Sequence, residues 1–331
     1  MWCLDNRTPL AAERNWIRDK DGVHWWLVAI AATYDIDDRG GLELADEQLP
    51  PLLAPEYFGD AGQSSLRRDS DLLEAKPGTD VIVHGSALAP GGRPAESVPV
   101  TLRLGSIDKR VVVFGERVYY EGAVGQTTTS PTPFVEQPIR YESAFGGGDV
   151  SDPDASKWKL DERNPVGRGF AGKDANTPAH TIEYASGRPN ATGPAGFGPI
   201  DRGWLPRRPL AGTYDAGWIE SRKPLLPTDY DPAFGLSAPA DQRSPVPLLG
   251  GERMAVSNMT PEGMLVVELP RKRFALSTRF GTKEHEHGAH LTTVLLETEE
   301  RRLSLVWQSA LRVRSPEVDH LDETTIEELS A

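Results

Sequence analysis

Three histidines stand close together in the run His285-Glu286-His287-Gly288-Ala289-His290, and imidazole nitrogens are common metal ligands. In an extended chain His285 and His287 point to the same side, so that with His290 they could hold a metal ion. The run lacks the helical His-Glu-x-x-His zinc motif, in which the histidines are four residues apart, and Gly288 favours a turn. We therefore expect an exposed polar loop before a strand that starts at Leu291, and no metal site.

The candidate nucleophiles and the glycine-rich loop do not match the sequence motifs of nucleophilic catalysis or phosphate binding. Ser64-Ser65 and Ser86 lack the Gly-x-Ser-x-Gly frame of a nucleophile elbow. Cys3, near the N-terminus and with no histidine nearby in the sequence, is a poor catalytic thiol. Gly146-Gly147-Gly148-Asp149 is not followed by Gly-Lys-Ser/Thr, which indicates a tight turn and not a phosphate loop. The sequence therefore predicts a protein that is not an enzyme and that requires no cofactor.

Acidic residues and tryptophans that suit a carbohydrate site occur at Asp215, Asp229, Trp204 and Trp218. Glycoside hydrolysis needs two carboxylates that face each other across a sugar-binding cleft, and the sequence fixes no separation between these groups. Tryptophan and tyrosine near turns more often fill the floor of a loop. A carbohydrate-active or carbohydrate-binding β protein is accordingly the alternative function.

The elements that must position such residues lie in an unusual segment, residues 141–250. It contains 15 of the 32 glycines, 14 of the 28 prolines and 11 of the 25 aromatic residues. A flexible linker rich in glycine and proline is normally poor in aromatic residues. We therefore expect an ordered but irregular set of turns, held in place by aromatic rings.

One turn in this segment has two interpretations. The run Arg163-Asn164-Pro165-Val166-Gly167-Arg168-Gly169-Phe170 begins with Asn-Pro, which initiates turns, and its two glycines allow close approach of backbone. In the structural interpretation, its arginines pair with Asp161 or Glu162. In the functional interpretation, the turn offers its backbone to a segment of a partner protein.

Charge and composition narrow the class of partner. The net charge of −13 and the lack of a concentrated basic patch argue against nucleic acid, because tracking phosphates requires such a patch. No apolar run is long enough to span a membrane, and no basic start followed by an apolar run marks a secretory signal. Cys3 is the single cysteine, so no internal disulfide can form, which fits a reducing compartment. We expect a soluble cytoplasmic protein without nucleic-acid or membrane partners.

Alternating and β-branched runs predict a mainly β fold with antiparallel, sandwich-like sheets, a long irregular insertion and few short helices. The expected organisation is an N-terminal β region (1–140), a loop-rich insertion (141–250) and a C-terminal β region (251–331) that packs with the first as one unit. Strands are expected at 23–36 (buried on both faces), 79–87, 98–104, 109–114, 118–120, 253–257, 264–269, 274–280, 291–297 and 303–308, and residues 42–70 are expected to be irregular.

Helix signals are weak. Thr8-Pro9 resembles an N-cap followed by proline at the first helical position, so we expect a short helix within residues 7–18. Residues 322–329 are expected to form one or two helical turns with an acidic face, or to fray.

An ordered series of short motifs resembles a bacterial family, and the match spans nearly the whole chain. The motifs are Leu4-Asp5-Asn6-Arg7-Thr8-Pro9, Lys76-Pro77-Gly78-Thr79-Asp80, Ala89-Pro90-Gly91-Gly92, Tyr141-Glu142-Ser143-Ala144-Phe145-Gly146-Gly147, Arg163-Asn164-Pro165-Val166-Gly167, Gly196-Phe197-Gly198-Pro199-Ile200, Ala211-Gly212-Thr213-Tyr214-Asp215, Pro224-Leu225-Leu226-Pro227 and Asp229-Tyr230-Asp231-Pro232. Together they resemble a domain-of-unknown-function family associated with type VI secretion clusters. The histidine run at 285–290 is not part of this pattern.

The resemblance implies an accessory adaptor or chaperone that binds a secreted effector or a PAAR-like tip protein, and possibly the valine–glycine-repeat spike, before firing. A structural component of the secretion machine is a third possibility. The family has no established catalytic residues to transfer to this chain. Aromatic and arginine side chains are the usual anchors of protein interfaces. We therefore expect partner binding at Arg163, Asn164, Trp204, Tyr214, Trp218 and Asp229.

Overall fold

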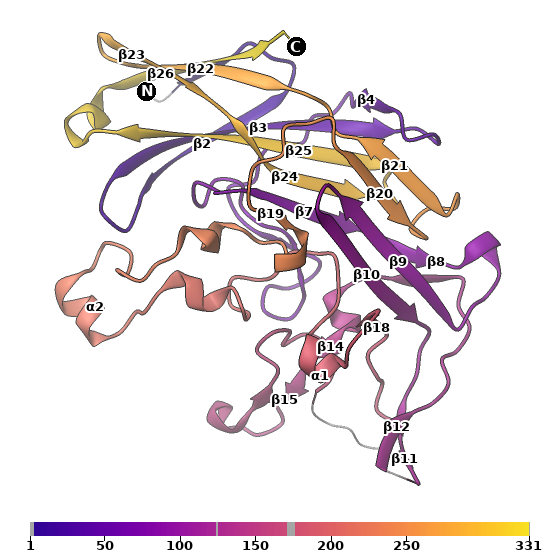
Figure 1. The fold of residues 1–331 in the computed structure, drawn as a ribbon. Coiled ribbons are helices and arrows are strands. Elements are labelled where there is room, and N and C mark those ends of the chain that lie inside the picture. Colours follow the sequence, from indigo (N-terminus) through magenta and orange to yellow (C-terminus); the bar gives the residue numbers. More distant parts are fainter. Residues whose placement is uncertain (1–2, 124, 171–175, 331) are drawn as a thin grey trace.

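The protein is mainly β, with several sheets and few short helices (Figure 1). The computed structural model describes residues 3–123, 125–170 and 176–330. Three large sheets, of seven, five and four strands, form most of the body. Smaller two-stranded ladders pair β5 (Glu56–Tyr57) with β6 (Leu66–Arg68), β8 (Ser86–Leu88) with β13 (Glu136–Pro138), and β11 (Tyr119–Gly122) with β12 (Gly125–Thr128).

The seven-stranded sheet lies at the centre. β7 and β24 run parallel, whereas the other pairs in this sheet are antiparallel. In spatial order the strands are β19 (Arg243–Ser244), β7 (Thr79–His84), β24 (His290–Glu297), β25 (Arg302–Val313), β3 (His24–Ile36) and β2 (Ala11–Arg18), and β4 (Leu42–Leu44) pairs with β3. β3 is buried along most of its length, which confirms the predicted strand with two buried faces.

One face of the central sheet packs against both smaller sheets, which gives a sandwich-like arrangement. The four-stranded sheet contains β1 (Cys3–Asn6), β26 (Leu321–Leu329), β22 (Arg273–Phe280) and β23 (Lys283–Gly288), in that order. The five-stranded sheet contains β18 (Ile182–Tyr184), β10 (Ile107–Phe114), β9 (Ser97–Leu104), β20 (Arg253–Ser257) and β21 (Met264–Glu268). The predicted hairpins β9–β10 and β24–β25 are both confirmed.

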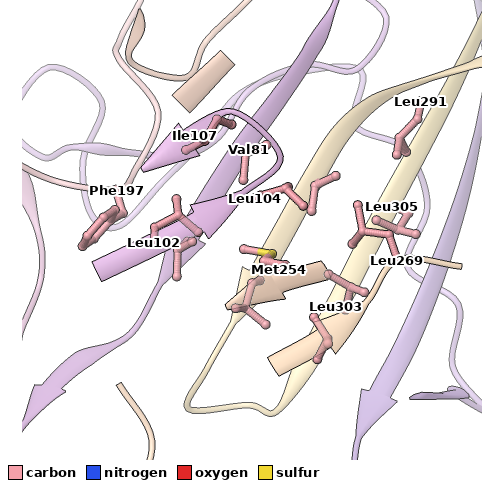
Figure 2. Packing of buried hydrophobic residues seen from close by; sticks show 14 of the residues in the cluster. Val81, Leu102, Leu104, Ile107, Phe197, Met254, Leu269, Leu291, Leu303 and Leu305 are labelled. Carbon is pink, nitrogen blue, oxygen red and sulfur yellow. The ribbon is translucent and has the colours of Figure 1, made fainter. Parts of the chain in front are cut away.

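Alternation along the strands fills this core. Every second residue of β3, from Trp26 to Tyr34, joins one continuous apolar cluster with side chains of the two covering sheets. Figure 2 shows Met254 of the five-stranded sheet beside Leu303 of β25, with Leu269 close by. Trp26 also donates from Nε1 to Oγ1 of Thr324 at 2.9 Å, which ties β3 to β26.

The opposite face of the central sheet is covered by loops. Leu27 and Ala29 of β3 pack with Leu72, which lies in the connection between β6 and β7. Ile82 and Leu295 pack with Ala238 of the insertion. The part of the insertion around Ala238 therefore lies on the face that the two smaller sheets leave uncovered.

Within the insertion, regular elements are short and separated by turns. None of those described is longer than six residues. They are η2 (Tyr141–Ser143), β14 (Phe145–Gly146), β15 (Gly148–Asp149), η3 (Ala155–Lys157), β16 (Lys159–Leu160), β17 (Arg168–Gly169), β18, α1 (Pro189–Thr192), η4 (Arg208–Ala211), α2 (Ala216–Ser221), η5 (Pro232–Gly235), η6 (Ala240–Gln242) and β19, where η marks a 3-10 helix; outside the insertion lie η1 (Pro90–Gly92) and η7 (Ser315–His320).

Both helix predictions near the termini are wrong. Residues 11–18 form β2, and the turn before it is built by Asn6, whose Oδ1 accepts hydrogen bonds from the amide and hydroxyl of Thr8. Residues 321–329 form β26, because Thr324 and Ile326 alternate into the core and the strand is paired on both sides, by β1 and β22.

Two further predictions, the loop before Leu291 and the continuous strand at 79–87, differ from the structure. Residues 283–288 are not a loop but β23, which forms a hairpin with β22. The strand expected at 79–87 is interrupted at Gly85, whose φ of 145° divides β7 from β8. Among the described residues, no helix has both the length and the apolar character needed to cross a membrane.

Candidate protein-interaction surface

A buried carboxylate at the start of β7 anchors the insertion to the central sheet. Asp80 is fully buried and forms an ion pair with Lys76 at 3.1 Å. Its two oxygens also accept hydrogen bonds from the backbone amides of Ser237 (2.8 Å) and Ala238 (3.1 Å). Because an unpaired buried charge is very costly, these bonds fix the insertion backbone against β7. This explains physically why the motif 76–80 carries both a lysine and an aspartate.

A second buried ion pair holds the middle of the insertion. The Arg207 side chain is completely buried, and its guanidinium lies 2.5 Å from the carboxylate of Asp69. It also donates to the carbonyl oxygens of Ile200 and Phe234, both at 2.9 Å. Burial by itself would raise the pKa of Asp69, but the positive charges of Arg207 and Arg202 outweigh it and lower that pKa. The carboxylate is therefore stabilised in its charged form.

The Asn-Pro turn has a structural role. Asn164 is buried, and its Nδ2 donates to the carbonyls of Tyr141 (2.7 Å) and Phe145 (3.1 Å). Gly146 lies so close that a Cβ there would be 2.2 Å from the Asn164 carbonyl oxygen. Arg163 pairs with Asp161 at 2.6 Å, as the structural interpretation of this turn expects.

Trp204 is also part of the interior. It is 6% exposed and meets the ring of Tyr141 edge to face, with ring centroids 5.7 Å apart. Three of the six predicted partner-binding residues, Arg163, Asn164 and Trp204, thus have internal contacts that account for their presence.

The other three predicted residues, Tyr214, Trp218 and Asp229, come together in residues 213–230, which we call the α2 arm. Asp229 accepts hydrogen bonds from the amide (3.0 Å) and hydroxyl (2.8 Å) of Thr213 and so closes the base of the arm. Asp215 caps α2 by accepting from the amide of Trp218 at 2.8 Å, and the Trp218 indole donates to the Leu225 carbonyl at 2.8 Å. The arm is held in shape by its own hydrogen bonds.

Two large apolar side chains on the α2 arm face solvent. Tyr214 is 51% exposed and Ile219 is 60% exposed. The Tyr214 ring packs edge to face on Trp218, with centroids 4.8 Å apart, so its orientation is fixed. In Figure 1 the arm extends away from the three sheets at the side where α2 is labelled. The sequence indicated Tyr214, but Ile219 was missed because a single isoleucine in a short polar helix gives no signal.

The base of the arm is joined to the body at two places. Lys20 donates from Nζ to the Tyr230 carbonyl at 3.1 Å, and the Arg222 guanidinium donates to the Lys20 carbonyl. The Tyr230 hydroxyl donates to the carboxylate of Glu74 at 3.0 Å. Burial raises the pKa of Glu74 above its usual range. The arm is therefore a supported projection with an ordered base.

A charged cleft of about 390 Å³ was missed by sequence reasoning. It lies where the parallel strands β7 and β24 end, an edge at which ligand sites are common in parallel sheets. Glu297 pairs there with Arg67 at 2.8 Å, and Ser86 donates to Glu299 at 2.5 Å. His84 contacts the Arg67 carbonyl through Nε2 at 2.7 Å, and burial lowers the pKa of His84 to about 4. Both strands were predicted, but their parallel pairing was not.

The histidine run is divided among different contacts. His287 bridges the two layers, with Nε2 2.7 Å from the Thr278 hydroxyl and Nδ1 2.5 Å from the Ser309 hydroxyl. His290 instead contacts the carbonyl of Lys76 through Nε2 at 3.1 Å. In the parts of the chain that the structure describes, no group of three histidine, cysteine or acidic residues is arranged to hold a metal ion.

Comparison with known proteins identifies the family. No curated protein matches the chain, and no solved structure does. A family model described as an uncharacterized protein conserved in bacteria (DUF2169) matches residues 21–308. The match includes the anchoring motif at 76–80, the turn at 163–167 and the whole α2 arm. The chain therefore belongs to the DUF2169 family of bacterial proteins.

Proposed function

We propose that this protein is an adaptor or chaperone that binds another polypeptide through the α2 arm. The observation that carries the proposal is the pair Tyr214 and Ile219, two large apolar side chains exposed on a segment that its own hydrogen bonds hold in place. Ordered apolar anchors lower the entropic cost of association, because little chain has to be immobilised on binding.

The net charge suggests the nature of the partner. At −13, the protein repels acidic surfaces and attracts basic ones, which speeds encounter with a cationic partner at low salt. A basic toxin such as a nuclease would be such a partner. Function in the cytoplasm, before secretion, is part of the same proposal.

The assignment to type VI secretion rests on the resemblance of the motif series. On that basis the proposed partner is a secreted effector or a PAAR-like tip protein, possibly together with the valine–glycine-repeat spike. The adaptor would hold this partner until it is loaded onto the spike. Membership of DUF2169 is compatible with this role, and the description of the family names no enzymatic activity.

The carbohydrate alternative has less support. Trp204 is buried against Tyr141, so it offers no face on which a sugar can stack. Asp215 caps α2 and Asp229 closes the base of the arm, so both carboxylates already serve local structure. A glycan array that shows specific sugar binding without any protein partner would reverse this preference.

Co-purification from native cells, with and without the neighbouring effector gene, tests the proposal. We expect the wild-type protein to recover a secretion component and the double variant Tyr214→Ser/Ile219→Ser to lose it. The double variant Leu53→Ser/Met264→Ser is the matched control, because Leu53 and Met264 are exposed to similar extents, 58% and 54%, outside the arm. Thermal melting of each variant separates loss of binding from loss of fold.

Recovery of no secretion component by the wild-type protein would refute the adaptor role. Equal losses in the arm variant and the control variant would refute the placement of the binding site on the arm. Stable incorporation into purified spike assemblies would identify a structural component of the machine instead.

A further inference from the structure

β23 is the last strand of the four-stranded sheet and, among the described residues, pairs only with β22. The hairpin closes between Phe280 and Lys283 through a two-residue loop in which Gly281 has a φ of 58°. In such a hairpin the closing pair exchanges both backbone hydrogen bonds, and every second pair does the same. The backbone groups of Lys283, His285 and His287 therefore face β22, and those of Glu284 and Glu286 face outward.

Two other edge strands, β2 and β18, are closed by the protein itself. On β2, the amides of Arg14 and Trp16 donate to side chains of their own strand, those of Glu13 and Asn15. β18 is bridged on its outer side by Ala144. Edge strands are usually protected in such ways, because a free edge is a template for pairing with another chain. The edge of β23 lacks these devices within the described part of the chain.

The side chains on the solvent-facing side of β23 are acidic. Glu284 and Glu286 are exposed on the face that points away from the central sheet, and neither belongs to an ion pair of the described residues. The nearby cations are already neutralised: Lys283 pairs with Glu317 at 2.6 Å, and Arg279 lies 3.6 Å from Glu323. This edge thus combines free backbone groups with two unneutralised negative charges.

We propose that the edge of β23 receives an extended segment of the partner protein as an added strand, with lysine or arginine at the positions beside Glu284 and Glu286. Main-chain hydrogen bonds would supply the affinity of such an added strand, and alternate side chains its specificity. The inference rests on the proposed adaptor function and names the chemistry of the bound segment. A second copy of this chain fits less well, because antiparallel pairing of two such edges would place glutamates beside glutamates.

Glu286→Pro tests the proposal without disturbing the hairpin, since residue 286 directs its N–H away from β22. Proline removes that donor and places its ring on the outer edge, a position at which edge strands tolerate proline. We expect binding of the partner to fall by about tenfold or more, with little change in melting temperature. Glu286→Ala is the matched control: it removes the same charge but keeps the N–H, so its loss should be smaller.

A second measurement does not require the native partner. The probe is a short synthetic peptide that alternates lysine with threonine, compared with a version in which glutamate replaces lysine. We expect the lysine peptide to shift the backbone amide resonances of Glu284, Glu286 and Gly288 in isotope-labelled protein, and the glutamate peptide to leave them unchanged. The double variant Glu284→Lys/Glu286→Lys should reverse this preference.

The outcomes separate the two proposals. If the wild-type protein recovers a secretion component and Glu286→Pro recovers it equally well, the edge proposal is wrong and the adaptor function stands. If no secretion component is recovered but the lysine peptide shifts the β23 amides, the adaptor function fails and the strand-addition site stands. Unchanged amides at millimolar peptide would refute the site. A dimer in solution that Glu286→Pro dissociates would identify a second copy as the occupant and overturn the proposed partner chemistry.

Discussion

Replacing Arg207 with methionine tests the idea that a buried ion pair joins the insertion to the body. The change keeps much of the aliphatic volume and removes the guanidinium, which contacts Asp69 and the carbonyls of Ile200 and Phe234. Asp69 would keep a hydrogen bond from the Ser70 amide at 2.7 Å and its bonds to Arg202, whose side chain is 29% exposed and therefore screened by solvent.

The expected loss of stability follows from these contacts. Removing one partner of a buried ion pair typically costs about 3–5 kcal/mol, because the remaining charge loses its buried counter-ion. The two orphaned carbonyl groups act in the same direction. With an unfolding entropy of about 2 cal/mol/K per residue, a loss of this size lowers the melting temperature of a chain this long by roughly 4–7 °C.

Urea denaturation and thermal melting measure the effect, and hydrogen exchange locates it. Arg208→Met is the matched control, because Arg208 is the adjacent residue and forms an exposed ion pair with Glu162 at 2.8 Å, which we expect to contribute less than about 1 kcal/mol. Amides of residues 200–237 should exchange faster in Arg207→Met than in the control. Equal stability of the two variants would show that the buried pair does not anchor the insertion.

Three further predictions concern other parts of the molecule. Burial lowers the pKa of His84 to about 4, below its unfolded value of about 6.5. The free energy of unfolding should therefore fall by roughly 3 kcal/mol as the pH drops from 6.5 to 4, because the unfolded state binds the proton more readily. His84→Gln should reduce this pH dependence, measured as the urea midpoint at each pH. Gly146→Ala should destabilise the fold by about 2 kcal/mol or more, because its Cβ would lie 2.2 Å from the Asn164 carbonyl oxygen; a melting temperature equal to that of the wild type would contradict this. Tyr214→Ala should lower the melting temperature only slightly, since it loses one edge-to-face ring contact of about 1 kcal/mol; a large drop in calorimetry would mean that the ring supports the arm.

The strands that sequence reasoning located are those whose pattern depends on their own side chains. β9 and β10 alternate apolar and polar residues around a glycine turn, and β3 is a continuous apolar run, so period and composition were sufficient. β26 was assigned to a helix because its glutamates suggested an acidic helical face. It is a strand because its two neighbours in the sheet supply hydrogen-bonding partners, which local sequence does not reveal.

Of the residues predicted to bind a partner, only some are exposed, for a comparable reason. Aromatic and arginine residues in a segment rich in turns were treated as one class, yet Trp204 is buried and Tyr214 is half exposed. Burial is decided by which loop lies beneath which sheet, and this depends on contacts such as that of Asp69 with Arg207, which are distant in sequence. The strand β23 was missed because Gly288 favoured a turn, so this run was expected to be an exposed polar loop.

The pairing of β3 with β25 has a consequence for synthesis of the protein. Asp35 pairs with Arg302 and His24 with Val313, so the centre of the large sheet joins the two ends of the chain. During translation, the apolar strand β3 leaves the ribosome long before the strand that covers its edge. Until β25 is made, β3 can pair with β2 on one side only, and its other edge remains without a partner. Such an exposed apolar edge favours slow folding and binding by chaperones. Any stop codon upstream of β25 would yield a product without a native core.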